Sequence, residues 1–163
     1  MGASLSINFI PNAIADPNAC IQRTLKVASE SGFDLSRLIF EVTQGERVDD
    51  IDLLTMIFVE YKSLGIRTNA GLNLLARFTP DFVKLDLDLV RDIDISPSKQ
   101  IIVKSVVEMS AKLGAQVLAE GAETERERDC LRAIGIDLMQ GYLFARPAFR
   151  HLATIGDDAW PTG

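Results

Sequence analysis

The sequence predicts an α/β fold in which six short strands alternate with helices, as in an incomplete (β/α)8 TIM-like barrel with about six βα units present. Two observations carry this prediction. Short apolar runs alternate with longer segments of helical periodicity, and glycine stands at nearly every predicted helix end. Strands that alternate with helices of this length form parallel sheets through right-handed crossovers. At 163 residues and 47% hydrophobic composition, the chain suits one domain with a sizeable core.

Turn residues and periodicity define the elements of the first half. Residues 4–9 alternate apolar and polar side chains and stop at Pro11-Asn12, which is typical of a strand. Residues 18–31 carry Ile21, Leu25 and Ala28 at helical spacing, and Gly32 ends this helix. The other elements expected here are a strand at 38–42, a helix at about 49–64 that ends at Gly65, and a very short strand from Ile66.

The second half repeats the pattern. A helix is expected at 97–113, because Pro97 is tolerated in a first helical turn and Gly114 follows the last apolar position. A charged helix is expected at 124–134, closed by Gly135. The strands expected between and around these helices are 82–87, 116–119 and 138–144.

Polar residues at strand ends favour a barrel over an open doubly wound sheet. Five strands each place one such residue at or near the carboxyl end: Asn8, Glu41, Asp86, Glu120 and Gln140. A barrel gathers all carboxyl ends into one ring, whereas an open sheet would scatter several along an edge. Eight-unit barrels run to about 250 residues, so six strands do not close one. Because Met1-Gly2-Ala3-Ser4 leads almost directly into a strand, we expect an amino-terminal part to be missing.

Composition excludes some classes of partner. The net charge of -6 disfavours binding to a nucleic acid polymer, which needs a basic surface. No signal peptide and no apolar run long enough to span a bilayer is evident, so we expect no membrane association and a cytoplasmic location. Cys20 and Cys130 lie far apart in helix-like segments and are expected to be buried, reduced thiols.

The strand-end residues suit metal chemistry. Carboxylate and amide oxygens are hard ligands for Mg²⁺ or Mn²⁺. Lys84 lies two residues before Asp86 on the same strand face and could hold a water or a phosphate oxygen. A pair of such metals polarises a phosphodiester and generates hydroxide near neutral pH. Taken singly, each residue is ordinary, but five matching positions favour an active-site ring.

Other polar features have plainer interpretations. His151 lies in a polar segment and is expected to be solvated. The series Asp86, Asp88, Asp92 and Asp94 lacks the glycine and terminal glutamate of a calcium-binding EF-hand. The charged run at 123–129 is expected to be an exposed helix face.

The chain resembles the EAL domain family, the phosphodiesterase module that linearises cyclic di-GMP. Five ordered segments carry the resemblance: Leu5-Ser6-Ile7-Asn8-Phe9, Phe40-Glu41-Val42-Thr43-Gln44, Val83-Lys84-Leu85-Asp86, Ala119-Glu120-Gly121-Ala122-Glu123 and Gln140-Gly141-Tyr142-Leu143. They look like the family's asparagine strand, its Glu-x-Thr-Glu and Lys-x-Asp strands and its last two signatures. The resemblance implies that residues 1–150 are the carboxyl-terminal two-thirds of such a domain and that 151–163 form a tail.

The same resemblance implies roles for individual residues. Asn8, Glu41 and Glu120 would be ligands of Mg²⁺ or Mn²⁺, and Asp86 would join this metal set by holding the metal-bound water. Lys84 and Glu120 would be catalytic, with Lys84 assisting the attacking water. In the substrate-binding set, Gln140 would support the site, and Glu123 and Tyr142 would face a guanine base.

The departures from the family pattern bear on activity. The glutamate strand that names the family is absent, and so is the Asp-Asp-Phe-Gly segment expected straight after Ile66-Arg67-Thr68, where the chain continues with Asn69-Ala70-Gly71. Gln44 stands where a glutamate usually supports that loop. The loss of three anionic ligands predicts weak metal occupancy and no hydrolysis of cyclic di-GMP.

Three functional hypotheses follow. The first is a degenerate, non-catalytic domain that binds cyclic di-GMP, a partner protein or a sensor domain. The second is an active metal-dependent phosphodiesterase whose missing strand and aspartate loop are unrecorded. The third is a dimerisation module, a possible homodimer, which predicts an exposed apolar patch at residues 72–78.

Overall fold

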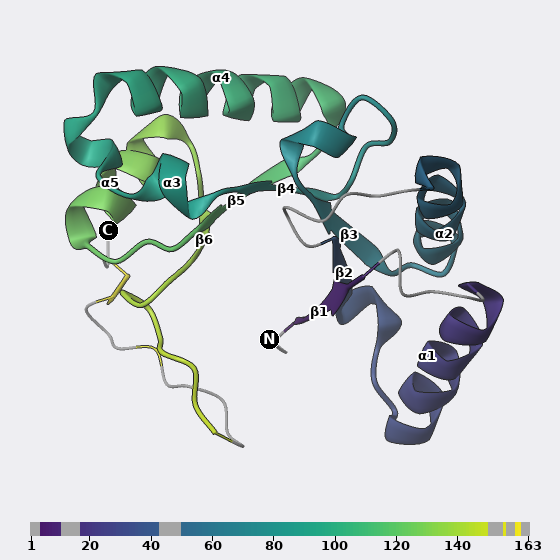
Figure 1. The fold of residues 1–163 in the computed structure, drawn as a ribbon. Coiled ribbons are helices and arrows are strands. Elements are labelled where there is room, and N and C mark those ends of the chain that lie inside the picture. Colours follow the sequence, from purple (N-terminus) through teal and green to yellow (C-terminus); the bar gives the residue numbers. More distant parts are fainter. Residues whose placement is uncertain (1–3, 11–16, 43–49, 150–154, 156–158, 161–163) are drawn as a thin grey trace. The chain divides into compact units, whose positions relative to one another are not determined.

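The protein consists of two compact units, Met1–Phe82 and Val83–Gly163, each with helices and parallel strands (Figure 1). A computed structural model describes residues 4–10, 17–42, 50–149, 155 and 159–160. Among these residues, no helix combines the length and the apolar character that crossing a membrane requires.

Three parallel strands form the sheet of the first unit. β1 (Leu5–Phe9) pairs with β2 (Leu38–Val42), and β2 pairs with β3 (Arg67–Ala70). Along the chain, α1 (Pro17–Ser31) lies between β1 and β2, and α2 (Ile51–Ser63) between β2 and β3. Two 3-10 turns, η2 (Leu35–Arg37) and η3 (Leu72–Leu74), flank the strands. Asp50 begins α2 as its N-cap, because its side chain accepts a hydrogen bond of 2.8 Å from the Leu53 N–H.

Aromatic side chains from the sheet and from α2 form the core of this unit. The rings of Phe40 and Tyr61 stack with centroids 4.2 Å apart, and Phe9 meets both rings edge-on. Tyr61 is fully buried, and aliphatic residues of α1, α2 and β2 complete the cluster. This cluster holds the strands and helices of the first unit together.

The second unit carries the other three strands. They are β4 (Phe82–Leu85), which starts at the last residue of the first unit, β5 (Gln116–Glu120) and β6 (Leu138–Gln140). β5 and β6 are parallel, with Glu120 opposite Gln140. The helical elements are α3 (Leu87–Val90), η4 (Ile93–Ile95), α4 (Pro97–Leu113) and α5 (Glu125–Ile134). Thr124 and Glu127 form a capping box that begins α5.

The predicted α/β class and all six strands are confirmed, with differences in length. The last strand ends at Gln140 rather than residue 144, because the backbone turns directly after it: the Phe144 and Ala145 N–H groups both donate to the Gly141 carbonyl. The helix α3 was not predicted, since four residues are too short to show helical periodicity. The predicted tail at 151–163 falls mostly outside the described residues and stays a prediction.

Two smaller expectations meet different outcomes. Residues 72–78 do not form the exposed apolar patch that the dimerisation hypothesis predicts: Leu74 is 5% exposed, and the ring of Phe78 lies 4.5 Å from that of Phe58. Cys130 is a free, half-buried thiol, and burial raises its pKa above the ordinary value. The side chain of Cys20 lies outside the described residues.

We expect Phe40→Ala to destabilise the protein by about 3–5 kcal/mol, because it empties the centre of the aromatic cluster. Urea unfolding measures this loss. Val59→Ala on the exposed side of α2, where Val59 is 64% exposed, is the control and should cost little. Equal losses for the two variants would contradict this description of the core.

Candidate functional site

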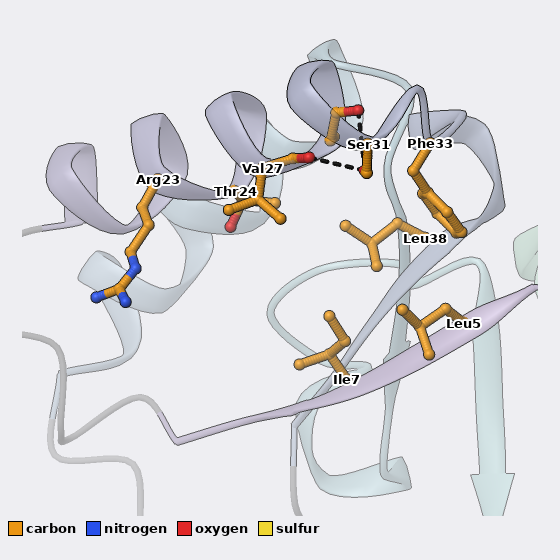
Figure 2. A pocket seen from close by; sticks show the side chains of 9 residues that line it. Leu5, Ile7, Arg23, Thr24, Val27, Ser31, Phe33 and Leu38 are labelled. Carbon is orange, nitrogen blue, oxygen red and sulfur yellow. Dashed lines mark hydrogen bonds between the residues drawn. The ribbon is translucent and has the colours of Figure 1, made fainter. Parts of the chain in front are cut away.

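The two faces of β1 differ in character. Leu5 and Ile7 point towards α1 and line, with Leu38 and Val27, an apolar cavity of about 360 Å³ (Figure 2). Because successive side chains of a strand alternate, Ser6 and Asn8 lie on the opposite face. The Ser6 hydroxyl donates to Glu41 Oε2 at 3.1 Å, so the side chain of Glu41 shares that face. No predicted site residue lines the apolar cavity.

Strand register places three oxygen-bearing side chains in one row on this polar face. Asn8 lies opposite Glu41 in the β1–β2 pair, and Glu41 lies opposite Asn69 in the β2–β3 pair. Asn8 is exposed, whereas Glu41 is 7% and Asn69 1% exposed. The structure thus brings together the predicted residues Asn8 and Glu41, and it adds Asn69.

The sequence analysis did not identify Asn69 as a site residue. It interpreted Asn69-Ala70-Gly71 as the chain that follows a missing loop, and not as the end of a strand. A signal was available. Gly65 ends a helix, and the next residues, Ile66-Arg67-Thr68-Asn69, can continue as a strand that ends in an amide, like the asparagine strand at residues 5–9.

In the second unit, the side chains of Lys84, Glu120 and Gln140 are in direct contact. Lys84 Nζ lies 2.7 Å from Glu120 Oε1, and Gln140 Nε2 donates to the same carboxylate oxygen. The side chains of Lys84 and Glu120 are 11% and 22% exposed. Such a partly buried, charge-assisted contact is stronger than a surface ion pair, and it fixes the carboxylate of Glu120 between a cation and an amide.

Asp86 is positioned by a local structural role. It is the N-cap of α3, and its Oδ1 accepts a hydrogen bond of 2.9 Å from the Asp88 N–H. The side chain is exposed. One of its oxygens is therefore engaged by the backbone that follows it.

A buried carboxylate, Glu127, holds the loop that follows β5. Its Oε2 accepts hydrogen bonds from the Glu123 and Thr124 N–H groups at 2.9 and 3.0 Å. Its Oε1 accepts from the Asp92 N–H at 2.8 Å, where Asp92 adopts the left-handed conformation with φ 57°. Burial by itself raises the pKa of Glu127, but these backbone hydrogen bonds outweigh it and leave the pKa below its ordinary value.

The predicted substrate-binding residue Glu123 is placed by this loop. Its backbone is tied to Glu127, and its carboxylate lies 3.7 Å from the Arg91 guanidinium. Both side chains of this pair are about half exposed, so the ion pair contributes little stability and can be replaced by a ligand.

A pocket of about 550 Å³ opens beside β5 and β6. Glu120, Gln140 and Tyr142 line it, together with Arg146 and Leu87. The Arg146 guanidinium lies over the Tyr142 ring, 4.4 Å from its centroid. Gly141 closes the turn with φ 157°, and a Cβ at this position would collide with the backbone of Ala122. The pocket has the volume of a small-molecule site, is open to solvent, and is lined mainly by apolar surface with a few polar groups.

The two units differ in how well they suit a divalent cation. In the first unit, the amide oxygen Oδ1 of Asn69 is buried and has no hydrogen-bond partner, and it belongs to a row of hard oxygen donors. These residues fit one cation. In the second unit, Glu120 and Asp86 each have an oxygen engaged by protein donors. Neither unit gathers three aspartate, glutamate, histidine or cysteine side chains for a metal among its described residues.

Comparison with known proteins places these features in a family. The sequence matches the EAL domain over residues 2–147. It is 32% identical over 152 residues to the cyclic di-GMP phosphodiesterase PdeR of Escherichia coli K12, covering 88% of this chain and 23% of that protein. It is 28% identical over 165 residues to the blue light- and temperature-regulated antirepressor BluF of the same organism, covering 96% of this chain and 40% of that protein. The chain thus spans less than half the length of either relative.

Solved structures agree. A standalone EAL protein from Vibrio cholerae O395, in a c-di-GMP-bound form, is 40% identical with a TM-score of 0.91, covering 98% of this chain and 70% of that one. A manganese and cyclic di-GMP complex of Klebsiella pneumoniae BlrP1 at pH 9.0 is 36% identical with a TM-score of 0.81, covering 88% and 39%.

The hydrogen bonds of Glu127 make stability depend on pH. Because the folded-state pKa lies below the ordinary value of 4.5, this carboxylate stabilises the protein above about pH 4.5 and loses that contribution as pH falls through the folded-state pKa. We expect Glu127→Gln to cost about 1–3 kcal/mol near neutral pH, since an amide offers one acceptor oxygen instead of two. The cost should shrink in acid. Urea unfolding at several pH values measures it, with exposed Glu108→Gln as the control. A cost of Glu127→Gln that does not change with pH would contradict the conclusion that the ionised carboxylate of Glu127 is what these backbone hydrogen bonds stabilise.

Gly141→Ala should distort the turn between β6 and the pocket, because the new methyl group would meet the Ala122 backbone. We expect a loss of about 3 kcal/mol in the free energy of unfolding. Gly114→Ala is the matched control: its φ is also positive, at 77°, but a Cβ there meets nothing within 4 Å. Left-handed strain alone should cost the control about 1–2 kcal/mol. Equal losses would show that the close backbone approach is unimportant.

Proposed function

Because this chain belongs to the EAL domain family, we propose that it binds cyclic di-GMP in the pocket beside β5 and β6 without hydrolysing it. The observation that carries the proposal is that the carboxylates of the second unit already contact donors of the protein itself. A preformed pocket with an aromatic ring and a guanidinium stands beside carboxylates that already have protein partners.

The pocket offers groups that suit a guanine nucleotide. The Tyr142 ring can stack on a base, since every base presents a π-face to an aromatic side chain. Arg146 lies over that ring and carries a positive charge suited to a phosphate. Glu123 is not among the residues that line the pocket, but it lies in the loop that follows β5, and its carboxylate can accept hydrogen bonds from the N–H groups of a guanine edge. Gln140, whose amide contacts Glu120, supports the pocket wall.

The charges of the second unit support binding rather than catalysis. Two-metal phosphodiester hydrolysis depends on carboxylates that hold cations and generate hydroxide. Here the carboxylate of Glu120 contacts the ammonium of Lys84, and one oxygen of Asp86 caps α3. In addition, the sequence lacks the paired aspartates that the family resemblance leads one to expect after Thr68.

Under this proposal the domain signals through a partner. A protein that binds a nucleotide without changing it transmits information only if another protein or a linked sensor domain responds to the bound state. The names of two relatives differ in kind, since PdeR is named a cyclic di-GMP phosphodiesterase and BluF a blue light- and temperature-regulated antirepressor. We place this activity in the cytoplasm as part of the same proposal.

Binding is tested with cyclic di-GMP and the purified protein by isothermal titration. We expect Tyr142→Ala to weaken binding by about 1–3 kcal/mol through lost stacking. Arg146→Gln should also weaken binding, while Arg77→Gln, an exposed arginine of the first unit, should not, although both remove the same charge. If Arg146→Gln and Arg77→Gln bind alike, the pocket is not the nucleotide site.

Hydrolysis is tested by incubating the protein and cyclic di-GMP with Mg²⁺ or Mn²⁺ and following the linear product. We expect no turnover. Turnover that Glu120→Ala abolishes would instead establish the alternative, an active phosphodiesterase in which Asn8, Glu41, Asp86 and Glu120 hold metal and Lys84 assists catalysis.

A further inference from the structure

We propose that Asn69 is a ligand of a single divalent cation, which it holds in the first unit together with Glu41 and Asn8. The starting observation is that the side-chain amide oxygen of Asn69 is buried and has no hydrogen-bond partner among the described residues. The residue is 1% exposed, and its Oδ1 has no hydrogen-bond partner in the structure. A buried carbonyl oxygen without a donor is costly, so its retention at this place indicates that something electropositive occupies the position beside it.

The register of the sheet identifies the neighbours of that oxygen. Asn69 is paired with Glu41, and Glu41 with Asn8, across three adjacent strands. Residues paired in this way project from the same face of a sheet. The contact between Ser6 and Glu41 confirms which face this is, since Leu5 and Ile7 point to the other side, towards α1 (Figure 2). The three donors therefore share the face that lies opposite the helices.

The donor set selects the kind of ligand. Two amide oxygens and one carboxylate are hard donors, which suit Mg²⁺, Mn²⁺ or Ca²⁺ and not Zn²⁺ or copper. A proton donor from the protein would satisfy Asn69 equally well, but none of the described residues provides one. With a single negative charge, this row can hold one cation weakly, with water completing its coordination.

This inference adds a residue that the family resemblance does not assign. The resemblance implies Asn8 and Glu41 as ligands, and it expects paired aspartates where the chain continues with Asn69. A neutral amide in place of charged side chains would preserve the geometry of one cation site while lowering its affinity. The inference is independent of nucleotide binding, because every contact it uses lies in the first unit.

The test uses Mn²⁺ alone, without nucleotide, and measures binding by titration and the rise in Tm that Mn²⁺ produces. Wild-type protein should bind with a Kd of about 10⁻⁴–10⁻³ M, the range of weak oxygen-ligand sites. Asn69→Asp adds a charge to the donor row and should tighten binding at least about tenfold. Without metal this variant should be less stable than wild type, because its new carboxylate is buried, and Mn²⁺ should restore its stability.

Asn73→Asp is the matched control, since it makes the same change at an exposed position four residues further along the chain. It should bind Mn²⁺ as the wild type does. Asn69→Leu removes the oxygen while keeping a similar volume, and it should abolish the Mn²⁺-dependent rise in Tm. Wild-type protein without any such rise, a retained rise in Asn69→Leu, or equal Mn²⁺ affinities for Asn69→Asp and Asn73→Asp would each overturn the proposal. Should Asn69→Leu fail to fold, the two aspartate variants decide. Failure to bind cyclic di-GMP would leave this result untouched.

Discussion

The parallel register between neighbouring strands is the constraint on which both functional groups of side chains depend. In the first unit it pairs Asn8 with Glu41 and Glu41 with Asn69, and in the second it pairs Glu120 with Gln140. Because side chains alternate along a strand, a shift of one residue would turn each of these polar groups to the opposite face. In β2, the same shift would move the apolar ring of Phe40 out of the core. Packing of the core and placement of the polar rows are therefore set by one choice of register.

Burying these polar groups costs free energy because they lose contact with water, and the two units compensate for this loss in different ways. In the second unit the carboxylate of Glu120 lies against Lys84 and Gln140, and the buried carboxylate of Glu127 accepts three backbone hydrogen bonds. In the first unit the side-chain oxygen of Asn69 has no hydrogen-bond donor among the described residues, and the proposed cation would take the place of that donor. A desolvated acceptor is tolerated where a hydrogen-bond donor or a cation compensates for the lost water.

Much of the fold could be predicted from the sequence, because the spacing of glycines and apolar runs reflects backbone physics directly. The helix α4 has the expected bounds, with Pro97 in its first turn and Gly114 in the left-handed conformation after its end. The short helix α3 was not predicted because four residues show no helical periodicity, and because its N-cap, Asp86, also fits the pattern of a strand-end ligand. A carboxylate in sequence does not reveal whether its oxygens cap a helix or hold a metal.

The same ambiguity explains why part of the candidate site could not be predicted. The contact of Glu120 with Gln140 requires the pairing of β5 with β6, and the contact of Glu120 with Lys84 requires β4 to lie beside β5. The importance of Asn69 depends on the lack of any hydrogen-bond donor for its Oδ1 among the described residues, and no sequence pattern encodes an unsatisfied atom.

Conversely, a motif can persist while its chemistry changes. Glu120 keeps its place in the Ala-Glu-Gly-Ala-Glu segment, yet a cation of the protein itself lies 2.7 Å from its carboxylate. An incoming metal ion would have to compete with that ammonium for the same oxygen, and its affinity would fall by the strength of the existing contact. Retention of the segment is therefore compatible with a domain that recognises a nucleotide and has lost the charge needed to cleave it.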